Sequence, residues 1–390
     1  MARQELLQRY QAIPLPTKSD EHWRFTDLTG FDPDAFVAEA TGVHVQPATM
    51  LEIDASGAAT VGEAGVTIDH APEDVRFELL TEDHPLLGSL VGHGEKFAAH
   101  NAAMWQHGLL VHVPRGVVLE KPIYIRIANS VEGGALFWRL LILAEAQSAF
   151  TVVEEYASST PELAGYSNAA VEIVVEDGAK VEYVSLQNLS QRTWHFASHH
   201  ARVERDAELD WVAGGFGSAG GKVWIQNDLA GQGATSRVTG AYFADHEQRL
   251  DYDTFQEHIA AHTTSDFAFK GVLRDDASAV WRGMIRVEEG AQKTNAYQEN
   301  RNLLLSKTAH ADSIPGLEIL ANDVRCTHGA TLSQVDREQL FYAMTRGLSR
   351  QEAERLIVRG FFQDVLDRIE LEPVREALGR ALEARIPEAV

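Results

Sequence analysis

Cysteine is nearly absent from this chain, whose 390 residues contain only Cys326. One cysteine permits no disulfide within the chain, which fits a reducing compartment. Long apolar runs are also missing, because no segment approaches the roughly 18 uncharged apolar residues that a membrane span needs. The opening MARQELLQRYQAIPLPTKSDEHW contains no apolar core of a secretion signal. We therefore expect a cytoplasmic protein with no membrane segment.

Positive charge is scarce. The 34 Lys and Arg residues stand against 57 Asp and Glu residues, which gives a formal net charge of −23. No run rich in Lys and Arg offsets this excess, so the chain as a whole repels a phosphate backbone. We expect no nucleic-acid partner.

The motifs of common catalytic sites are missing too. No P-loop, no GxGxxG followed by a helix and no GxSxG is present. The Gly-rich stretch 214–222, GGFGSAGGK, predicts a turn, because no helical pattern follows it. His258 and His262 have a spacing of four residues but lack the Glu of a zinc-protease HExxH, and WHFASHH, with His195, His199 and His200, is equally ambiguous. These patterns therefore identify no catalytic site in the sequence.

What the chain does contain is a long β-rich region. With 45% hydrophobic residues it can bury a large core. From about residue 105 to 332, short strand-like runs such as KPIYIRIAN and AAVEIVVEDG end at Gly, Asp or Asn. Runs of this kind are typical of a β-solenoid or a β-sandwich.

A faint repeat favours the solenoid. An acidic or Gly-rich turn, an alanine and an alternating strand recur around Ala179, Ala207 and Ala234, which are 28 and 27 residues apart. The pattern extends back to Ala149 and, more loosely, forward to Ala277 and Ala291. A near-constant period of roughly 20 to 50 residues marks stacked turns that bury their apolar faces on one another. We therefore predict a β-helix-like core.

The ends of the chain have a different texture. The first 95 residues mix helical and turn signals, and we expect Trp23, Phe25 and Phe31 to pack onto the core. After residue 335 the apolar period becomes helical. Capping-box spacings occur at Asp336 with Gln339 and at Ser349 with Glu352. The second helix has an apolar stripe made of Ala353, Leu356, Ile357, Gly360, Phe361 and Leu366. We predict three regions, 1–95, 96–334 and 335–390.

The single cysteine lies two positions before a histidine, in DVRCTHGATL at 323–332. In an extended strand the side chains of Cys326 and His328 point to the same face. Gly329 follows, and its missing Cβ lets another backbone approach. A lone Cys is more often a small buried apolar residue, but thiolate and imidazole together suit iron, zinc or the edge of a cluster. One such pair cannot supply the four ligands of a stable iron–sulfur cluster, so any such site must be shared with a second chain.

Three segments carry a resemblance that covers nearly the whole chain. The stretch from QENRNLLLSKTAHADSIPGLEILANDVRCTHGATL into DREQLFYAMTRGL, at 298–348, resembles the C-terminal signature of the SufB/SufD family of iron–sulfur cluster assembly proteins. PTKSDEHWRFTDL at 16–28 and HGLLVHVPRGVVLEKPI at 107–123 are similar to its SufD branch, as is the DVxCxHGAT pattern. The chain also lacks the cysteine that SufB-type scaffolds carry in the middle of the β region.

The resemblance implies a mainly β fold, with a right-handed parallel β-helix core, an N-terminal α/β region and a C-terminal helical domain. It also implies a non-catalytic subunit that pairs with a SufB-like scaffold and docks a SufC-like ABC-type ATPase. His328 matches a family histidine at the interface, implicated as a ligand together with a SufB cysteine, and Cys326 matches a neighbouring cysteine. The cofactor would be a transient iron–sulfur cluster or iron, shared with the partner and not held stably by this chain alone. We expect the ATPase to dock around Arg346, Gly347, Leu348 and the helix from Ser349.

Two alternatives remain open. A homodimer could bring two Cys326/His328 pairs together across a two-fold axis and so act as a self-sufficient scaffold. A carbohydrate-active β-helix enzyme is the alternative from another class, because solenoids often hold sugar-cleaving acids in a surface groove.

Overall fold

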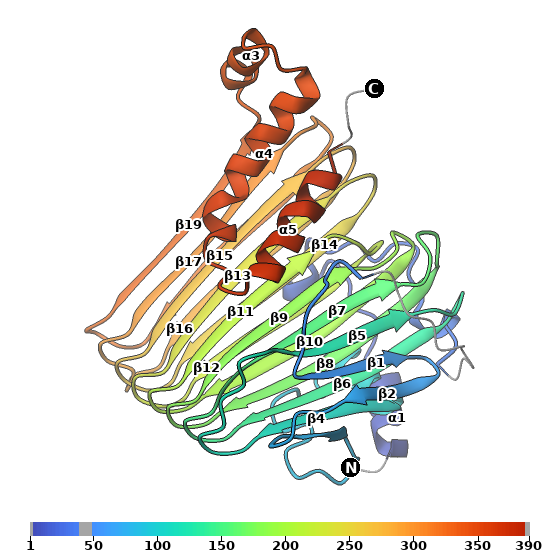
Figure 1. Cartoon of the computed structure of the whole chain (residues 1–390), viewed down its shortest axis with the longest axis vertical. Helices are drawn as coiled ribbons and strands as arrows, with labels where there is room; N and C mark the ends of the chain where they lie inside the picture. Colours follow the sequence, from blue (N-terminus) through green and yellow to red (C-terminus); the bar gives the residue numbers. More distant parts are fainter. Residues whose placement is uncertain (1–2, 39–48, 387–390) are drawn as a thin grey trace.

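Two long sheets face each other along the molecule, which a computed structural model describes for residues 3–38 and 49–386. Successive strands alternate between the sheets, and each long strand pairs in parallel with the strand two places away in the sequence (Figure 1). Two strands therefore make one turn of a parallel β-solenoid. This confirms the predicted mainly β solenoid with helices at both ends of the chain.

The ten-stranded sheet, the first sheet, contains β1 (Gly57–Gly62), β2 (Gly65–His70), β5 (Ile123–Asn129), β7 (Ala149–Ser158), β9 (Lys180–Asn188), β11 (Glu208–Gly215), β13 (Thr235–Ala244), β15 (Thr264–Leu273), β17 (Asn295–Leu304) and β19 (Arg325–Gln334). The nine-stranded sheet, the second sheet, contains β3 (Arg76–Leu79), β4 (His107–Val113), β6 (Ala135–Ala144), β8 (Gly165–Val175), β10 (Thr193–Val203), β12 (Gly220–Leu229), β14 (Arg249–His258), β16 (Ser278–Val287) and β18 (His310–Ile319).

The sequence repeat corresponds to one turn of this solenoid. Ala179, Ala207 and Ala234 directly precede β9, β11 and β13, and the strand register stacks them in one fully buried column. The neighbouring turns place small hydroxyl residues in the same column, namely Ser148, Thr263 and Thr294. Small side chains fit where the chain bends sharply between packed sheets.

The other predicted members of the repeat lie outside this column. Ala149 is in register with Lys180, one residue beyond it. Ala277 precedes β16 of the second sheet, and Ala291 lies in the turn before β17 of the first. Their spacing of 14 residues is thus half a turn, because each turn contains one strand from each sheet.

The N-terminal segment covers the outer face of the second sheet. It contains α1 (Arg3–Ala12), the short helices η1 (Glu21–Trp23) and η2 (Pro33–Ala35), and α2 (Lys96–Met104). Trp23 and Phe31 are buried against Phe97 and Phe196, as predicted. The prediction for Phe25 is wrong, because this side chain is 46% exposed. It lies next to Arg24, whose guanidinium carbon is 5.8 Å from the ring centroid.

The C-terminal helices lie on the opposite side, over the first sheet (Figure 1). They are α3 (Arg337–Thr345), α4 (Arg350–Leu366) and α5 (Glu372–Ala384). Helices α4 and α5 form an apolar cluster with the outward residues of the sheet, whereas α3 extends beyond it. Ser349 and Glu352 form the predicted capping box, but Asp336 accepts from the N–H of Glu338 instead of that of Gln339.

The predicted apolar stripe of α4 is partly wrong. The buried residues are Ala353, Val358, Phe362, Val365 and Leu366, whereas Leu356 is 56% exposed. The helix packs against the sheet, α3 and α5 at once, so its buried surface is not one straight stripe.

The strands of the first sheet extend from β1 to Gln334. β1 pairs in parallel with β5, so this sheet begins before residue 96, and helical structure resumes at Arg337. The division of the chain into three domains stays a prediction. Within residues 3–38 and 49–386, no helix has both the length and the apolar content to cross a membrane.

Candidate functional site

The Cys326/His328 pair lies on β19, the last strand of the first sheet. Cys326 is in register with Ala296 of β17, and His328 with Gln298. Ala296 and Gln298 are buried inside the solenoid. Because paired residues of a parallel sheet point to the same side, Cys326 and His328 share one face of the strand, as predicted, and that face is the interior one.

The two side chains differ in exposure. Cys326 is partly buried and contacts an apolar cluster formed by Ile285, Val287, Ala291, Ala296 and Ala321. His328, two residues further along the same strand, is exposed. Burial raises the pKa of the Cys326 thiol. The thiol therefore keeps its proton in the isolated chain, and a metal must displace that proton to bind sulfur.

The pair has no third ligand among the residues that the structure describes. Among the described residues, no three His, Cys, Asp or Glu side chains form a group that could hold a metal ion. Sulfur and imidazole nitrogen are donors that iron accepts, but two ligands are half of what a cluster needs. This donor pair is therefore too small to hold a cluster by itself.

Gly329 does not serve a close contact within the chain. A Cβ added there would lie 3.9 Å from its nearest neighbours, Glu299 Cβ and Tyr297 Oη. The space beside Gly329 is open, so the expected approach of another backbone is not made by the residues that the structure describes.

The strand that carries this pair is also an edge strand. β19 and β18 are the last strands of their sheets, and no described strand pairs with their outer edges. Leu317, Ile319, Leu320 and Leu332 are 36% to 51% exposed at this end of the solenoid. Unpaired edges with exposed apolar side chains are typical of surfaces that another chain covers. We call this surface, made of β18 and β19, the open end.

The other histidines flagged in the sequence do not form a site. His258 is fully buried and contacts Thr263 and Ser265, whereas His262 lies exposed in a turn. His195 and His199 are buried, and burial lowers their pKa values to about 4 and about 3. His200 contacts Asp228 at 2.8 Å.

Sequence reasoning missed a layer of amide side chains below the pair. Gln298, Asn300 and Asn302 of β17 lie in register with His328, Ala330 and Leu332 of β19, and all three are buried. The signal was present in QENRN, where an amide occurs at every second residue. A period of two residues puts all three side chains on one face of the strand.

The residues predicted to dock an ATPase lie at the junction of α3 and α4. Arg346 and Gly347 are exposed, and the Arg346 guanidinium donates to Tyr342 Oη at 3.1 Å. Leu348 packs between the helices, and Ser349 caps α4. The junction thus has both an exposed part and a structural part.

An exposed apolar patch beside this junction was also missed. Phe341, Tyr342 and Met344 of α3, together with Leu356 of α4, are 43% to 69% exposed. We call these four residues the α3 patch. The helical period of α3 was recognised in the sequence, but its buried face could not be, because only Leu340 and Ala343 of this helix are buried.

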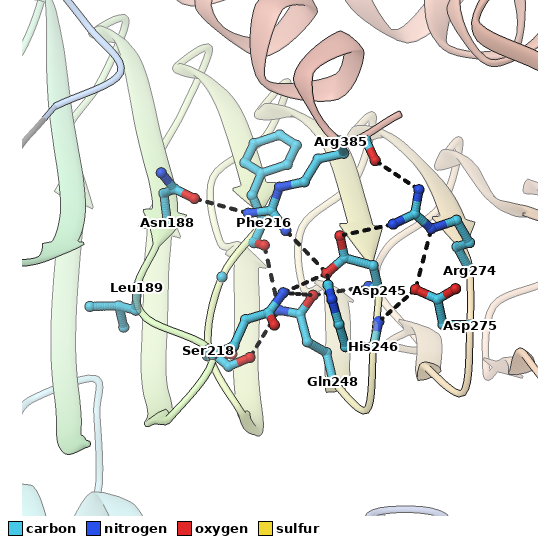
Figure 2. Close-up of polar contacts among 12 residues, drawn as sticks. Asn188, Leu189, Phe216, Ser218, Asp245, His246, Gln248, Arg274, Asp275 and Arg385 are labelled. Carbon is cyan, nitrogen blue, oxygen red and sulfur yellow. Dashed lines mark hydrogen bonds and ion pairs between the residues drawn. The ribbon is translucent and has the colours of Figure 1, made fainter. Parts of the chain in front are cut away.

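Polar contacts fasten the helices to the solenoid. Figure 2 shows Arg385, at the end of α5, among residues of the solenoid turns. Its guanidinium donates to Asn188 Oδ1 at 3.0 Å and lies 3.6 Å from the buried carboxylate of Asp245. Lys270 of β15 pairs with Asp364 of α4. These contacts make α4 and α5 a fixed extension of the first sheet.

Comparisons with known proteins agree with the fold. The family model described as SUF system FeS cluster assembly, SufBD core domain, matches residues 126–361. An iron–sulfur cluster assembly SufBD family protein of Mycobacterium tuberculosis is 30% identical over 381 residues, with 95% of this chain and 89% of the relative covered. SufD of Bacillus subtilis is 31% identical over 292 residues, which cover 75% of this chain and 67% of that protein. SufB of the same organism is 28% identical over 277 residues, which cover 71% of this chain and 60% of that protein.

Proposed function

This chain belongs to the SufBD family of iron–sulfur cluster assembly proteins, and from this membership we propose that it is the SufD-type subunit of a cytoplasmic Suf assembly complex. In this proposal the chain catalyses no reaction. It contributes half of a site for a nascent cluster, a surface for a SufB-like scaffold and a dock for a SufC-like ATPase.

The observation that carries the proposal is the position of Cys326 and His328. Both face inward on the last strand of the first sheet, beside an unpaired edge. A SufB-like solenoid that continued the sheets at this edge would place its own side chains next to the pair. The missing ligands would then come from the partner, and the described residues of this chain supply no third one.

The cluster is the cargo of this site. Ligation split between two chains suits a cluster that must later leave, because separating the strands removes half of its ligands at once. His328 is the more accessible of the two donors and can reach an incoming metal first. Cys326 must lose its proton to bind, so we expect it to join later or to support the histidine.

The α3 patch and the neighbouring Arg346 form the proposed ATPase dock. Exposed aromatic and Met side chains beside an Arg are the residue types enriched at protein interfaces. Because α4 and α5 are fastened to the first sheet, a displacement of α3 can be passed to the solenoid.

Co-purification followed by anaerobic cluster reconstitution tests the proposal. We expect the wild-type chain to bind SufB-like and SufC-like counterparts, and the complex with His328→Ala to assemble but fail to build or hold the cluster. His310→Ala is the matched control, since His310 is also an exposed histidine on an edge strand of the open end. Normal reconstitution with His328→Ala would reduce the pair to a structural role, and failure to bind either counterpart would remove the proposed function.

A homodimeric scaffold is the second candidate, favoured by the same unpaired edges, which a second copy could pair. It predicts cluster-type absorbance on the reconstituted chain alone, lost in Cys326→Ser. Membership of the SufBD family gives no support to the carbohydrate-active alternative.

A further inference from the structure

The interior of the solenoid changes from apolar to polar side chains directly beneath the open end. Gln298 and Asn300 of β17 point inward and are in register with Phe267 and Phe269 of β15, one turn deeper. All four side chains are fully buried. Aromatic rings thus fill the interior one turn below, and amides fill it just under His328.

Gln298 connects strands of both sheets. Its Nε2 donates to the carbonyl oxygens of Gly283 on β16 and Gly316 on β18, each at 3.1 Å. Its Oε1 accepts from Gln256 Nε2 on β14 at 3.3 Å. Its backbone lies next to His328 in the register of β17 and β19. One buried side chain therefore ties the edge strand β18 to the strand that supports β19.

A second link runs beside the first. Asn300 Oδ1 accepts hydrogen bonds from Asn302 Nδ2, at 2.6 Å, and from the hydroxyl of Ser313 on β18. Asn302 Nδ2 also lies 3.1 Å from Ser313 Oγ. Both links cross the interior from β17 to β18.

The backbone is shaped to receive Gln298. A Cβ added to Gly283 would lie 2.6 Å from Gln298 Oε1 and 2.2 Å from the Trp281 ring. Only glycine therefore leaves room for the amide to reach the carbonyl oxygen of residue 283. The close fit fixes the orientation of the Gln298 amide.

The open end needs such a link more than the middle turns do. β18 and β19 each have a neighbouring strand on one side only among the described residues. Apolar contacts alone allow small sliding movements, whereas hydrogen bonds depend on both distance and angle. A surface that is held in its bound geometry beforehand binds more tightly, because less order is lost on association.

We propose that Gln298 is a positioning residue: it holds β18 and β19 at a fixed separation, so that His328 and the two free edges meet the partner scaffold in one geometry. This role rests on the proposed function for the partner, but the bracing itself is a property of the isolated chain. The two parts can therefore be tested separately.

Hydrogen exchange of the isolated chain tests the bracing. Gln298→Leu keeps the approximate volume and removes all three hydrogen bonds, so we expect amide exchange in 310–319 and 325–334 to rise at least about 10-fold. Gln187→Leu is the matched control, because Gln187 is also buried and donates to a glycine carbonyl, that of Gly217 at 3.0 Å, but lies on β9. The control should leave exchange at the open end unchanged.

Binding to the SufB-like partner tests the positioning role. We expect Gln298→Leu to weaken binding at least about 10-fold and Gln187→Leu to leave it unchanged. In Gln298→Glu, an ionised carboxylate would face two carbonyl oxygens, so binding should recover in part as the pH falls and the carboxyl gains a proton. The Gln298→Leu variant should show no such recovery beyond that of the wild type.

The exchange experiment decides whether Gln298 braces the open end, and the binding experiment decides whether that bracing positions the partner surface. Unchanged exchange in Gln298→Leu overturns the bracing whatever the partner does, and faster exchange with unchanged affinity overturns the positioning role. If the wild type fails to bind the partner, the proposed function and the positioning role fall together, while the exchange result still stands. Should Gln298→Leu not fold, Ser313→Ala removes the second link and should act in the same direction with a smaller effect.

Discussion

Cys326 and His328 show how two neighbouring donors can have different chemistry. The thiol is partly buried against apolar side chains, and its imidazole neighbour is exposed. The same strand thus carries one donor that is open to solvent and one thiol that burial keeps protonated.

Because Cys326 is the only thiol, its alkylation reports on the open end alone. We expect iodoacetamide to react more slowly with the folded chain than with the chain in urea, since folding partly buries the sulfur. Binding of a SufB-like partner should slow the reaction at least another ~10-fold if the partner covers β19. Equal rates with and without a bound partner would place the interface elsewhere.

Glu154 is an unusual residue in the solenoid interior. This fully buried carboxyl group on β7 accepts hydrogen bonds from Trp138 Nε1 at 2.7 Å, from Tyr156 Oη at 3.2 Å and from the hydroxyl of Tyr183. Burial raises its pKa to about 7, although the three hydrogen bonds oppose the rise. The folded chain therefore holds a proton here at a pH where the unfolded chain has lost it.

We expect this group to make the chain less stable as the pH rises. The contribution is complete below the unfolded pKa, near 4.5, and is lost as the pH passes through about 7. It amounts to roughly 3 kcal/mol over that interval. Glu154→Gln should flatten the dependence of the urea midpoint on pH between 5 and 7, and Glu247→Gln, at an exposed turn, should not. A Glu154→Gln curve parallel to that of the wild type would contradict the assignment.

Among the elements, the C-terminal helices divide into a fixed part and an exposed part. α4 and α5 are packed on the first sheet and held by pairs such as Lys270 with Asp364. α3 contacts mainly α4 and exposes most of its side chains. Because α3 has few buried residues, its surface is available for a partner. Because α4 and α5 are packed on the first sheet, a displacement of α3 can be passed to that sheet.

Truncation of the α3 patch should therefore affect binding without affecting the fold. Phe341 is 69% exposed, so we expect Phe341→Ala to leave the thermal midpoint unchanged and to weaken binding of a SufC-like ATPase at least ~10-fold. Phe25→Ala is the control, because Phe25 is also exposed but lies in the N-terminal segment. Isothermal titration with the ATPase measures both variants, and equal affinities would place the dock elsewhere.

The whole molecule is a stack of solenoid turns, and the terminal strands differ between its two ends. At one end the antiparallel strands β2 and β3 finish the sheets, and at the other no strand of the described residues pairs with the outer edges of β18 and β19. In a solenoid each turn is stabilised mainly by its neighbours, so a terminal turn has half the support of a middle one. The amide layer adds hydrogen bonds at the end that carries the candidate site.

This asymmetry predicts a gradient of hydrogen exchange along the stack. We expect strong protection in the middle strands, such as β9 and β11, and faster exchange in β18 and β19 of the isolated chain. Adding a SufB-like partner should raise protection in β18 and β19 and leave β2 and β3 as they were. Protection gained at β2 and β3 instead would move the interface to the opposite end of the solenoid.

Local patterns accounted for much of this architecture. Alternating strands and the spacing of Ala179, Ala207 and Ala234 predicted the solenoid, since each feature depends on near neighbours in the chain and on a constant turn length. The capping box at Ser349 and the shared face of Cys326 and His328 follow from the geometry of single elements in the same way. Ala277 was misplaced because a similar turn occurs at both corners of each repeat, and Ala149 lies one residue beyond the column at the same corner.

Other features depend on which elements come to lie against one another. The exposure of Phe25, the buried face of α4 and the α3 patch are set by packing among segments far apart in the chain, which no local period encodes. The same holds for the amide of Gln298, whose three partners come from β14, β16 and β18. Composition and spacing were enough to predict a solenoid with a Cys and a His on one face of a strand, because these are properties of single strands and turns. The stacking of the turns placed that pair at an unpaired edge above a buried polar layer, because burial and edge position arise only when distant strands meet.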